Sequence, residues 1–203
     1  MTGSRAPAPS LPDLGVVPVV GRARGQFTHP LDGRYGALDP RELRAVVAWL
    51  AAQLAVDDFD CALGIPEGGL VPAYAFAAAT GLRVALGTVW QPDLPGVISF
   101  AEKHDPPPLT FKHVYGLAPG DRVVVVEDEV TSGHTIVNCV RALRAASVRC
   151  DTVVSVYIAD DPAMRARLAA EGIRLIVAGT FAPDLGTHLY AAPSTRPDRP
   201  IAT

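Results

Sequence analysis

The stretch of sequence that decides the fold is Val123-Val124-Val125-Val126-Glu127-Asp128-Glu129-Val130-Thr131-Ser132-Gly133-His134-Thr135. Four consecutive valines predict a strand that is buried on both faces, as the strands of parallel sheets are. Acidic residues follow the valines directly. A short loop of hydroxyl-bearing residues and glycine then leads into a predicted helix over residues 134–146. The stretch therefore predicts one strand–loop–helix unit of a parallel α/β sheet.

Similar units lie on both sides of this stretch. Apolar runs predict strands over residues 59–63, 82–89, 122–126, 152–158 and 173–178. Apolar periodicity, capping residues and helix breakers predict helices over residues 40–55, 70–80, 134–146 and 162–170. This alternation predicts an α/β fold, a doubly wound parallel sheet with helices on both of its faces.

Ligands of doubly wound sheets bind at the carboxyl ends of the strands. The candidate site loops are therefore residues 64–69, 91–112, 127–135 and 159–162. The segment 91–112 is rich in proline and glycine and has room for a weak hairpin. A loop of this length is usually functional or disordered.

The two ends of the chain differ from its middle in composition. Residues 1–15 and 191–203 are rich in proline and small residues, so we expect two flexible tails. Residues 16–190 are expected to form a single domain, which suits a chain of 203 residues.

The charge, the apolar stretches and the cysteine content exclude some classes of function and indicate a cellular compartment. The chain has 18 basic and 21 acidic residues, which gives a net charge of −3 and no basic surface for nucleic acid. The longest uncharged apolar stretch, residues 68–82, is interrupted by glycine and proline, so we expect no membrane span. No secretory signal is visible, and the three cysteines form no C-x-x-C motif. We therefore expect a cytoplasmic protein.

The loop before the predicted helix at 134 has the features of a phosphate site. A helix N-terminus offers unpaired backbone N–H groups and the positive end of the helix dipole. Thr131, Ser132 and Thr135 add hydroxyl donors, and Gly133 lets the backbone approach a ligand closely. We expect the phosphate to be held by Thr131, Ser132, Gly133, His134 and Thr135.

The acidic residues need a separate explanation, because carboxylates repel a phosphate. They fit a ligand that places hydroxyl groups, a cation or developing positive charge beside them. A ribose 5-phosphate meets these conditions, with its phosphate on residues 131–135 and its hydroxyls on Glu127 and Asp128. The alternative is a capped helix after a strand, with both acids solvated at the rim of the sheet.

This stretch resembles the 5-phosphoribosyl 1-diphosphate (PRPP) motif of type I phosphoribosyltransferases. The resemblance is specific there and extends more weakly over residues 21–181. Residues 64–73 resemble the diphosphate loop of the family, and residues 100–104, Phe-Ala-Glu-Lys-His, resemble the start of the mobile loop in its xanthine and adenine enzymes. Residues 27–32 resemble their base-covering segment.

The resemblance implies transfer of 5-phosphoribose from PRPP to a nitrogen of a nucleobase-like acceptor, with release of diphosphate. It implies a small base-covering hood, formed by about residues 16–38 and 179–190, and a homodimer active in purine salvage. Mg²⁺ would be bound through PRPP, with Asp128 as a candidate ligand. The implied catalytic residues are Glu127, Asp128 and Lys103. The implied PRPP-binding residues are Glu67, Gly68, Gly69 and residues 131–135, and the implied base-binding residues are Phe27, His29, Ile158 and Asp160.

Three residues depart from the family pattern. Glu102 stands where the mobile loop of the family has arginine, and its carboxylate is unfavourable beside a diphosphate. Asp160 stands where the xanthine enzymes have a base-reading lysine; an aspartate suits an amino group or ring N–H, or caps the helix before Pro162. Thr131 replaces an aspartate of the hypoxanthine–guanine enzymes and resembles the orotate enzymes.

These departures leave three functions open. The first is transfer to a purine of the adenine or xanthine type. The second is transfer to orotate or a specialised metabolite. The third is a PRPP-sensing regulator without catalysis, which the negative net charge and the short N-terminal extension disfavour.

Overall fold

A five-stranded parallel sheet forms the centre of the computed structural model, which describes residues 7–17, 26–34, 36–102 and 110–182. Its strand order is β4-β3-β7-β8-β9. The strands are β3 (Cys61–Gly64), β4 (Arg83–Leu86), β7 (Arg122–Val130), β8 (Arg149–Ala159) and β9 (Arg174–Phe181). All four pairings are parallel, as the apolar runs predict.

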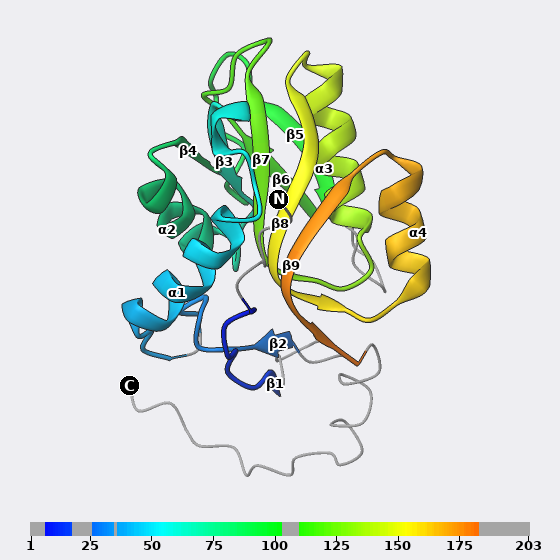
Figure 1. Cartoon of the computed structure of the whole chain (residues 1–203). Helices are drawn as coiled ribbons and strands as arrows, with labels where there is room; N and C mark the ends of the chain where they lie inside the picture. The colour runs from blue at the N-terminus through cyan, green and yellow to red at the C-terminus, as the bar shows by residue number, and fades with distance from the viewer. Residues whose placement is uncertain (1–6, 18–25, 35, 103–109, 183–203) are drawn as a thin grey trace, which may run out of the picture.

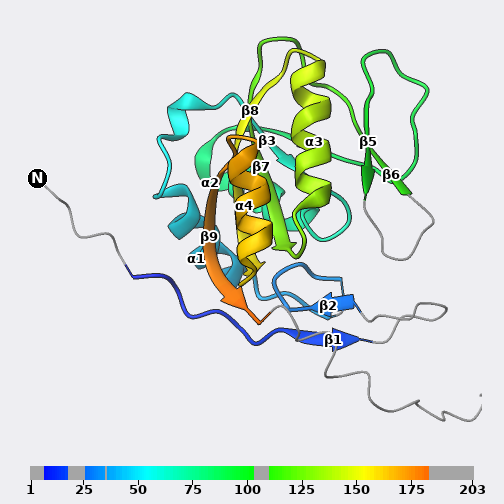
Figure 2. The same ribbon diagram turned by 90° about the vertical axis from the view of Figure 1, so that its right-hand side faces the viewer.

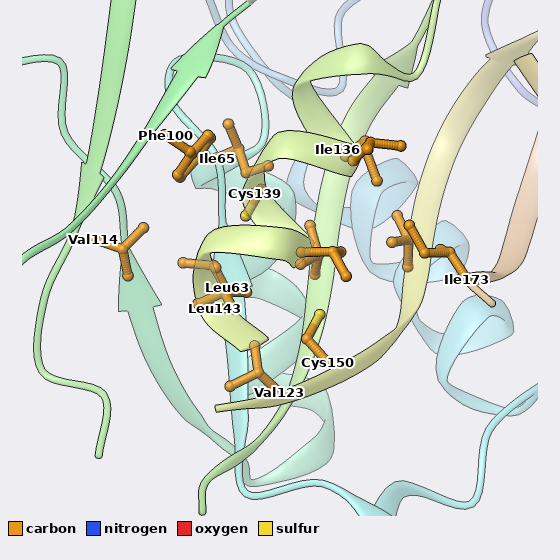
Figure 3. Packing of buried hydrophobic residues seen from close by; sticks show 14 of the residues in the cluster. Leu63, Ile65, Phe100, Val114, Val123, Ile136, Cys139, Leu143, Cys150 and Ile173 are labelled. Atoms are coloured by element: carbon orange, nitrogen blue, oxygen red, sulfur yellow. The ribbon is translucent and has the colours of Figure 1, made fainter. Parts of the chain in front are cut away.

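Helices cover both faces of the sheet (Figure 1). One face carries α1 (Pro40–Ala51) and α2 (Leu70–Thr80), and the other carries α3 (His134–Ala145) and α4 (Pro162–Ala170). The valines of β7 alternate between the two apolar cores: Val124 and Val126 pack on the α1–α2 side, and Val123 and Val125 on the α3–α4 side. Figure 3 shows the second core, in which Cys139 and Leu143 of α3 lie beside Leu63 and Val123 of the sheet.

The predicted elements are present, with shifts at their ends. Helices α2 and α4 have the predicted bounds. Helix α1 begins at Pro40 with Asp39 as its N-cap, but it ends at Ala51 and is followed by a short 3₁₀ helix, η1 (Val56–Asp58). Strand β4 stops at Leu86 because Thr88 turns away to bridge His113.

The largest difference concerns β7, which continues to Val130 although the apolar run ends at Val126. Beyond Val126 its partner on one side, β3, has already ended at Gly64. The pairing with β8 continues through Glu127 and Glu129 to Val130. The acidic residues therefore lie inside the strand and not in the loop after it, at the point where the β3 side of the sheet opens.

Two hairpins lie outside the central sheet. Strands β5 (Ile98–Glu102) and β6 (Thr110–Val114) form the hairpin for which the segment 91–112 has room. Figure 2 shows it beside α3, where the Asn138 side chain donates a hydrogen bond to the Ala101 carbonyl (2.9 Å). Strands β1 (Gly15–Val17) and β2 (Gln26–Thr28) pair at the carboxyl end of the sheet (Figure 1), within the predicted hood.

The predicted hood and tails are described in part. Residues 179–181 complete strand β9, and residues 183–190 of the hood lie outside the described residues. Leu11 and Leu14 of the predicted N-terminal tail pack on the α1–α2 core, and the Tyr157 hydroxyl donates to the Pro12 carbonyl (2.5 Å). Residues 1–6 and 191–203 are not described. Within the described ranges, no helix has the length and apolar character needed to cross a lipid bilayer.

Candidate active site

Glu127 and Asp128 lie at the carboxyl end of the sheet, between the ends of β3 and β8. Both are buried, with 8% and 3% of their surface exposed. Strands β3 and β7 are neighbours, but the chain leaves them in opposite directions, to β4 on one side and to β8 on the other. Such a switch point is where open α/β sheets form their ligand crevice.

A glycine-rich loop packs directly against the two acids. It runs from Ile65 to Gly69, where the Gly69 N–H donates to the Ile65 carbonyl (3.1 Å). Gly68 lies against the Asp128 carboxylate, and a Cβ atom on Gly69 would lie 2.8 Å from Oε2 of Glu127. Glu67 is exposed. The loop and the acid pair, predicted from separate parts of the sequence, therefore form one site.

The predicted phosphate loop opens helix α3 beside the acids. Gly133 is the N-cap residue, with a φ of +73° that favours glycine, and no side chain caps the helix. Thr131 and Ser132 are exposed, and His134 and Thr135 are half-buried. The Ser132 hydroxyl lies 3.1 Å from Nδ1 of His134, and Arg167 donates to the Ser132 carbonyl. The first turn of α3 therefore presents backbone N–H groups that are available to an anion.

Three residues of the predicted hood, His29, Asp32 and Arg34, form a cluster beside Asp128. The sequence contains no pattern that predicts a site role for Arg34. The Arg34 Nη2 atom lies 2.5 Å from Oδ2 of Asp128 and 2.6 Å from Oδ2 of Asp32. His29 is fully buried beside them, with its Nε2 atom 3.6 Å from Oδ2 of Asp128. This Nε2 atom has no hydrogen-bond partner. Ion pairs between positions 34 and 128 are not visible in a sequence.

Burial and charge push the pKa values of the acids in different directions. Burial, with the nearby Asp128 charge, raises the pKa of Glu127 well above its usual range. Burial also acts to raise the pKa of Asp128, but His29 and the Arg34 charge overcome it and hold that pKa below its usual value. The surroundings therefore favour the protonated form of Glu127 and the ionised form of Asp128. Burial, assisted by Asp128, raises the pKa of Glu129 to about 8.

The predicted base-binding residues are distributed over the hood and β8. Phe27 packs against Phe181 with ring centroids 4.8 Å apart, and His29 packs against Tyr157 at 4.9 Å. Ile158 is fully buried in the α3–α4 core.

Asp160 is the most exposed of the predicted base-binding residues. Its side chain is 70% exposed and lies 3.8 Å from the Arg165 guanidinium. It does not cap α4, because the N-cap is Asp161, whose carboxylate accepts from the Ala163 N–H. The helix-capping alternative for Asp160 is therefore wrong.

The hairpin β5–β6 explains how Glu102 is accommodated. Its Oε2 atom lies 2.9 Å from Nζ of Lys112 and accepts from the Thr110 hydroxyl (2.7 Å). The Lys112 side chain is 7% exposed. Glu102 is therefore neutralised across the hairpin. Lys103, the predicted catalytic lysine, lies outside the described residues.

A metal ion has one candidate position among the described residues. His29, Asp32 and Asp128 each place a ligand atom within 4.8 Å of the others. The two carboxylates suit Mg²⁺, which prefers oxygen, but the imidazole does not. The Arg34 guanidinium already supplies positive charge at this position. The protein residues alone are therefore a poor Mg²⁺ cage, and a site completed by phosphate oxygens fits better.

Comparisons with known proteins agree with this geometry. No protein-family model matches the chain. It is 28% identical over 140 residues to a hypoxanthine/guanine phosphoribosyltransferase of Methanosarcina acetivorans, which covers 68% of this chain and 73% of that protein. It is 32% identical over 95 residues to an orotate phosphoribosyltransferase of Pelotomaculum thermopropionicum, over 47% of this chain and 42% of that protein.

Solved structures show the same fold. The APRTase of Giardia lamblia, complexed with 9-deazaadenine, superposes with a TM-score of 0.69 at 16% identity, over 83% of this chain and 93% of that one. The adenine phosphoribosyltransferase of Rhodothermus marinus gives a TM-score of 0.67 at 16% identity, over 83% and 94%. The sequence relatives, the fold and the arrangement of the acid pair and its two loops agree with the resemblance of this chain to type I phosphoribosyltransferases.

Proposed function

We propose that this chain is an enzyme that transfers 5-phosphoribose from PRPP to a ring nitrogen of a nucleobase, most directly a purine, and releases diphosphate. One observation carries the proposal. The Glu127–Asp128 pair, the glycine loop at 65–69 and the N-terminus of α3 meet at the switch point of a parallel sheet. The names of the sequence relatives support the same reaction.

Each part of the site has a role that its chemistry suits. The 5-phosphate would lie on the N–H groups of residues 131–135, and the ribose hydroxyls on Glu127 and Asp128. The ionised Asp128 would also stabilise positive charge that develops on the sugar as diphosphate leaves. Backbone N–H groups of Gly68 and Gly69 would hold the diphosphate, and Lys103 would add a positive charge to it.

Mg²⁺ belongs to this proposal as a companion of PRPP. Asp128 is the residue that would contact it, once Arg34 has left that carboxylate. Bound with PRPP, the ion would neutralise charge on the diphosphate.

Phe27 and His29 of the hood, with Ile158 and Asp160 of the β8 end, are the proposed base-binding residues. An orotate-type acceptor is the second candidate, because the chain is 32% identical over 95 residues to an orotate phosphoribosyltransferase and Thr131 fits that class.

We also propose a homodimer in the cytoplasm. Large apolar residues are exposed on α2, after β4 and on β6, with Trp90 at 81%, Tyr74 at 63% and Phe111 at 51%. Exposed apolar surface of this kind is typical of a protein interface.

Three free, buried cysteines favour a reducing compartment.

Diphosphate release tests the proposal. The purified chain would be mixed with PRPP and Mg²⁺, and with adenine, xanthine, hypoxanthine, guanine, orotate or uracil in turn. We expect release that depends on at least one acceptor. PRPP binding without release for any acceptor would support the sensor alternative and refute the enzyme.

A further inference from the structure

Arg34 forms an ion pair with the Asp128 carboxylate, to which the ribose hydroxyls are proposed to bind. Its Nη2 atom lies 2.5 Å from Oδ2 of Asp128, and its side chain is 15% exposed. His29 approaches the same Oδ2 atom, and Gly68 lies against the carboxylate from the glycine loop. Because Asp128 is only 3% exposed, a ribose hydroxyl reaches it only if one of these neighbours moves.

Of these neighbours, Arg34 is the one whose charge opposes the proposed chemistry. A guanidinium paired with Asp128 cancels the negative charge that would stabilise a cationic sugar. His29 is fully buried and packed on Tyr157, and Gly68 is fixed in the loop before α2. Arg34 comes from the edge of the hood and keeps contact with solvent. It is therefore the group that the sugar displaces.

Displacement from Asp128 does not release Arg34 from the hood. Its backbone N–H donates to Oδ1 of Asp32 (2.8 Å), and its Nε–H donates to Oδ2 of the same residue (2.7 Å). The Asp32 side chain is fully buried, so this anchor stays in place when Asp128 changes partner. The Nη2 group then remains beside the sugar, under the hood that is proposed to cover the acceptor base.

A guanidinium in this position selects for oxygen. It has N–H donors and no acceptor, so it binds a carbonyl or carboxylate oxygen and is repelled by an amino group, which is itself a donor. Asp160, which would favour an amino group, is 70% exposed and paired with Arg165. Arg34, by contrast, places a partly buried cation directly beside the acid pair.

We propose that Arg34 exchanges Asp128 for a carbonyl or carboxylate oxygen of the acceptor when PRPP binds, and so selects oxygen-bearing bases over amino bases. This inference rests on the proposed function and deepens it. It places 6-oxopurines and orotate in the favoured substrate class and adenine outside it. Asp32 is the residue that positions Arg34 for both partners.

The test is the ratio of kcat/KM for hypoxanthine or orotate to kcat/KM for adenine, in wild type and in Arg34→Gln. We expect the variant to lower this ratio roughly 10- to 100-fold, the scale of a hydrogen bond to a charged donor. PRPP affinity, measured by calorimetry without acceptor, should be equal or higher because the competitor for Asp128 is gone. This ratio is not affected if part of the variant is unfolded, because both values of kcat/KM then fall by the same factor.

Two comparisons sharpen the result. Arg34→Lys, which keeps the charge without the planar fork, should keep part of the selectivity. Arg41→Gln is the matched control, because that side chain is 90% exposed on α1 and should leave the ratio unchanged. An unchanged ratio in Arg34→Gln, or a fall in PRPP affinity instead, would overturn the inference while leaving the transfer reaction intact. No turnover of any acceptor by the wild type would refute the proposed function itself.

Discussion

Gly68 lies against the carboxylate of Asp128, so closely that a Cβ atom at position 68 would overlap the Asp128 Cγ and both oxygens. Gly68 comes from the loop before α2 and Asp128 from strand β7, so the two residues are far apart in sequence. Asp128 cannot move aside without cost, because Arg34 and His29 lie on its other side. The close packing of the glycine loop on the acid pair thus requires a residue without a Cβ atom at position 68.

Gly68→Ala should therefore damage both stability and activity. The added methyl group displaces either the Asp128 carboxylate or the 65–69 loop, at a cost of about 1–3 kcal/mol in the free energy of unfolding. Urea unfolding and the rate of diphosphate release measure the two effects. Gly36→Ala is the control, since no atom lies within 4 Å of a Cβ at that position. Full activity in Gly68→Ala would mean that the close packing has no role in the site.

Replacement of the acid pair tests its role in catalysis. The double variant Glu127→Gln, Asp128→Asn keeps the shapes and removes the negative charge that Asp128 carries. Turnover should fall by at least ~100-fold, the scale for lost transition-state electrostatics. Steady-state kinetics with PRPP give the rate, and circular dichroism shows whether the fold is kept. Near-normal turnover in a folded variant would contradict the assignment.

Glu129 should make the protein less stable as the pH rises. Its pKa is about 8 in the folded chain against an ordinary 4.5, and its Oε2 atom is buried without a hydrogen-bond partner. Between these values the folded state binds a proton that the unfolded state has lost, so stability falls with rising pH. Glu129→Gln removes the contribution of this carboxyl group to the pH dependence of stability. The stability of this variant relative to wild type should increase by about 1 kcal/mol or more from about pH 5 to about pH 8, as measured by urea unfolding. A difference in stability that stays constant with pH would show that folding does not raise the pKa of Glu129.

The Lys112–Glu102 pair should stabilise the β5–β6 hairpin. Lys112→Met removes the ammonium group that lies 2.9 Å from the half-buried Glu102 carboxylate and should cost about 2 kcal/mol. Glu102→Gln should cost less, because Lys112 can keep a neutral acceptor. The double variant should recover part of the loss, which unfolding of all four proteins measures as a coupling energy. Additive losses would mean that the pair contributes little.

The fold was predictable because its signals are local. Four valines in β7, the cap at Asp39 and the C-cap at Gly81 are each read within a few neighbouring residues, and they define buried strands and helix ends. Strand ends were less predictable. Strand β7 extends past its apolar run because β8 supplies a partner, and pairing between distant segments leaves no local pattern.

The arrangement of the candidate site was predictable where its residues are neighbours in the sequence. The acid pair and the loop 131–135 are adjacent in the chain, and their combination indicated phosphate and hydroxyl recognition. Arg34 gave no such signal, since its partners are one residue nearby, Asp32, and one 94 positions away, Asp128. The ion pair between Glu102 and Lys112 was equally hidden, because it depends on the hairpin register, which places Thr110 opposite Glu102 and Lys112 diagonally from it, opposite Phe100.

Phosphorus NMR of PRPP with the enzyme, Mg²⁺ and an acceptor tests the central claim most directly. Transfer to a base predicts that the PRPP resonances disappear while free diphosphate and a nucleoside 5′-monophosphate appear in equal amounts. The folded Glu127→Gln, Asp128→Asn variant should leave the spectrum nearly unchanged over the same time. Unchanged PRPP in the wild-type sample with every acceptor, or diphosphate formed without any nucleotide, would contradict the assignment of this chain as a phosphoribosyltransferase.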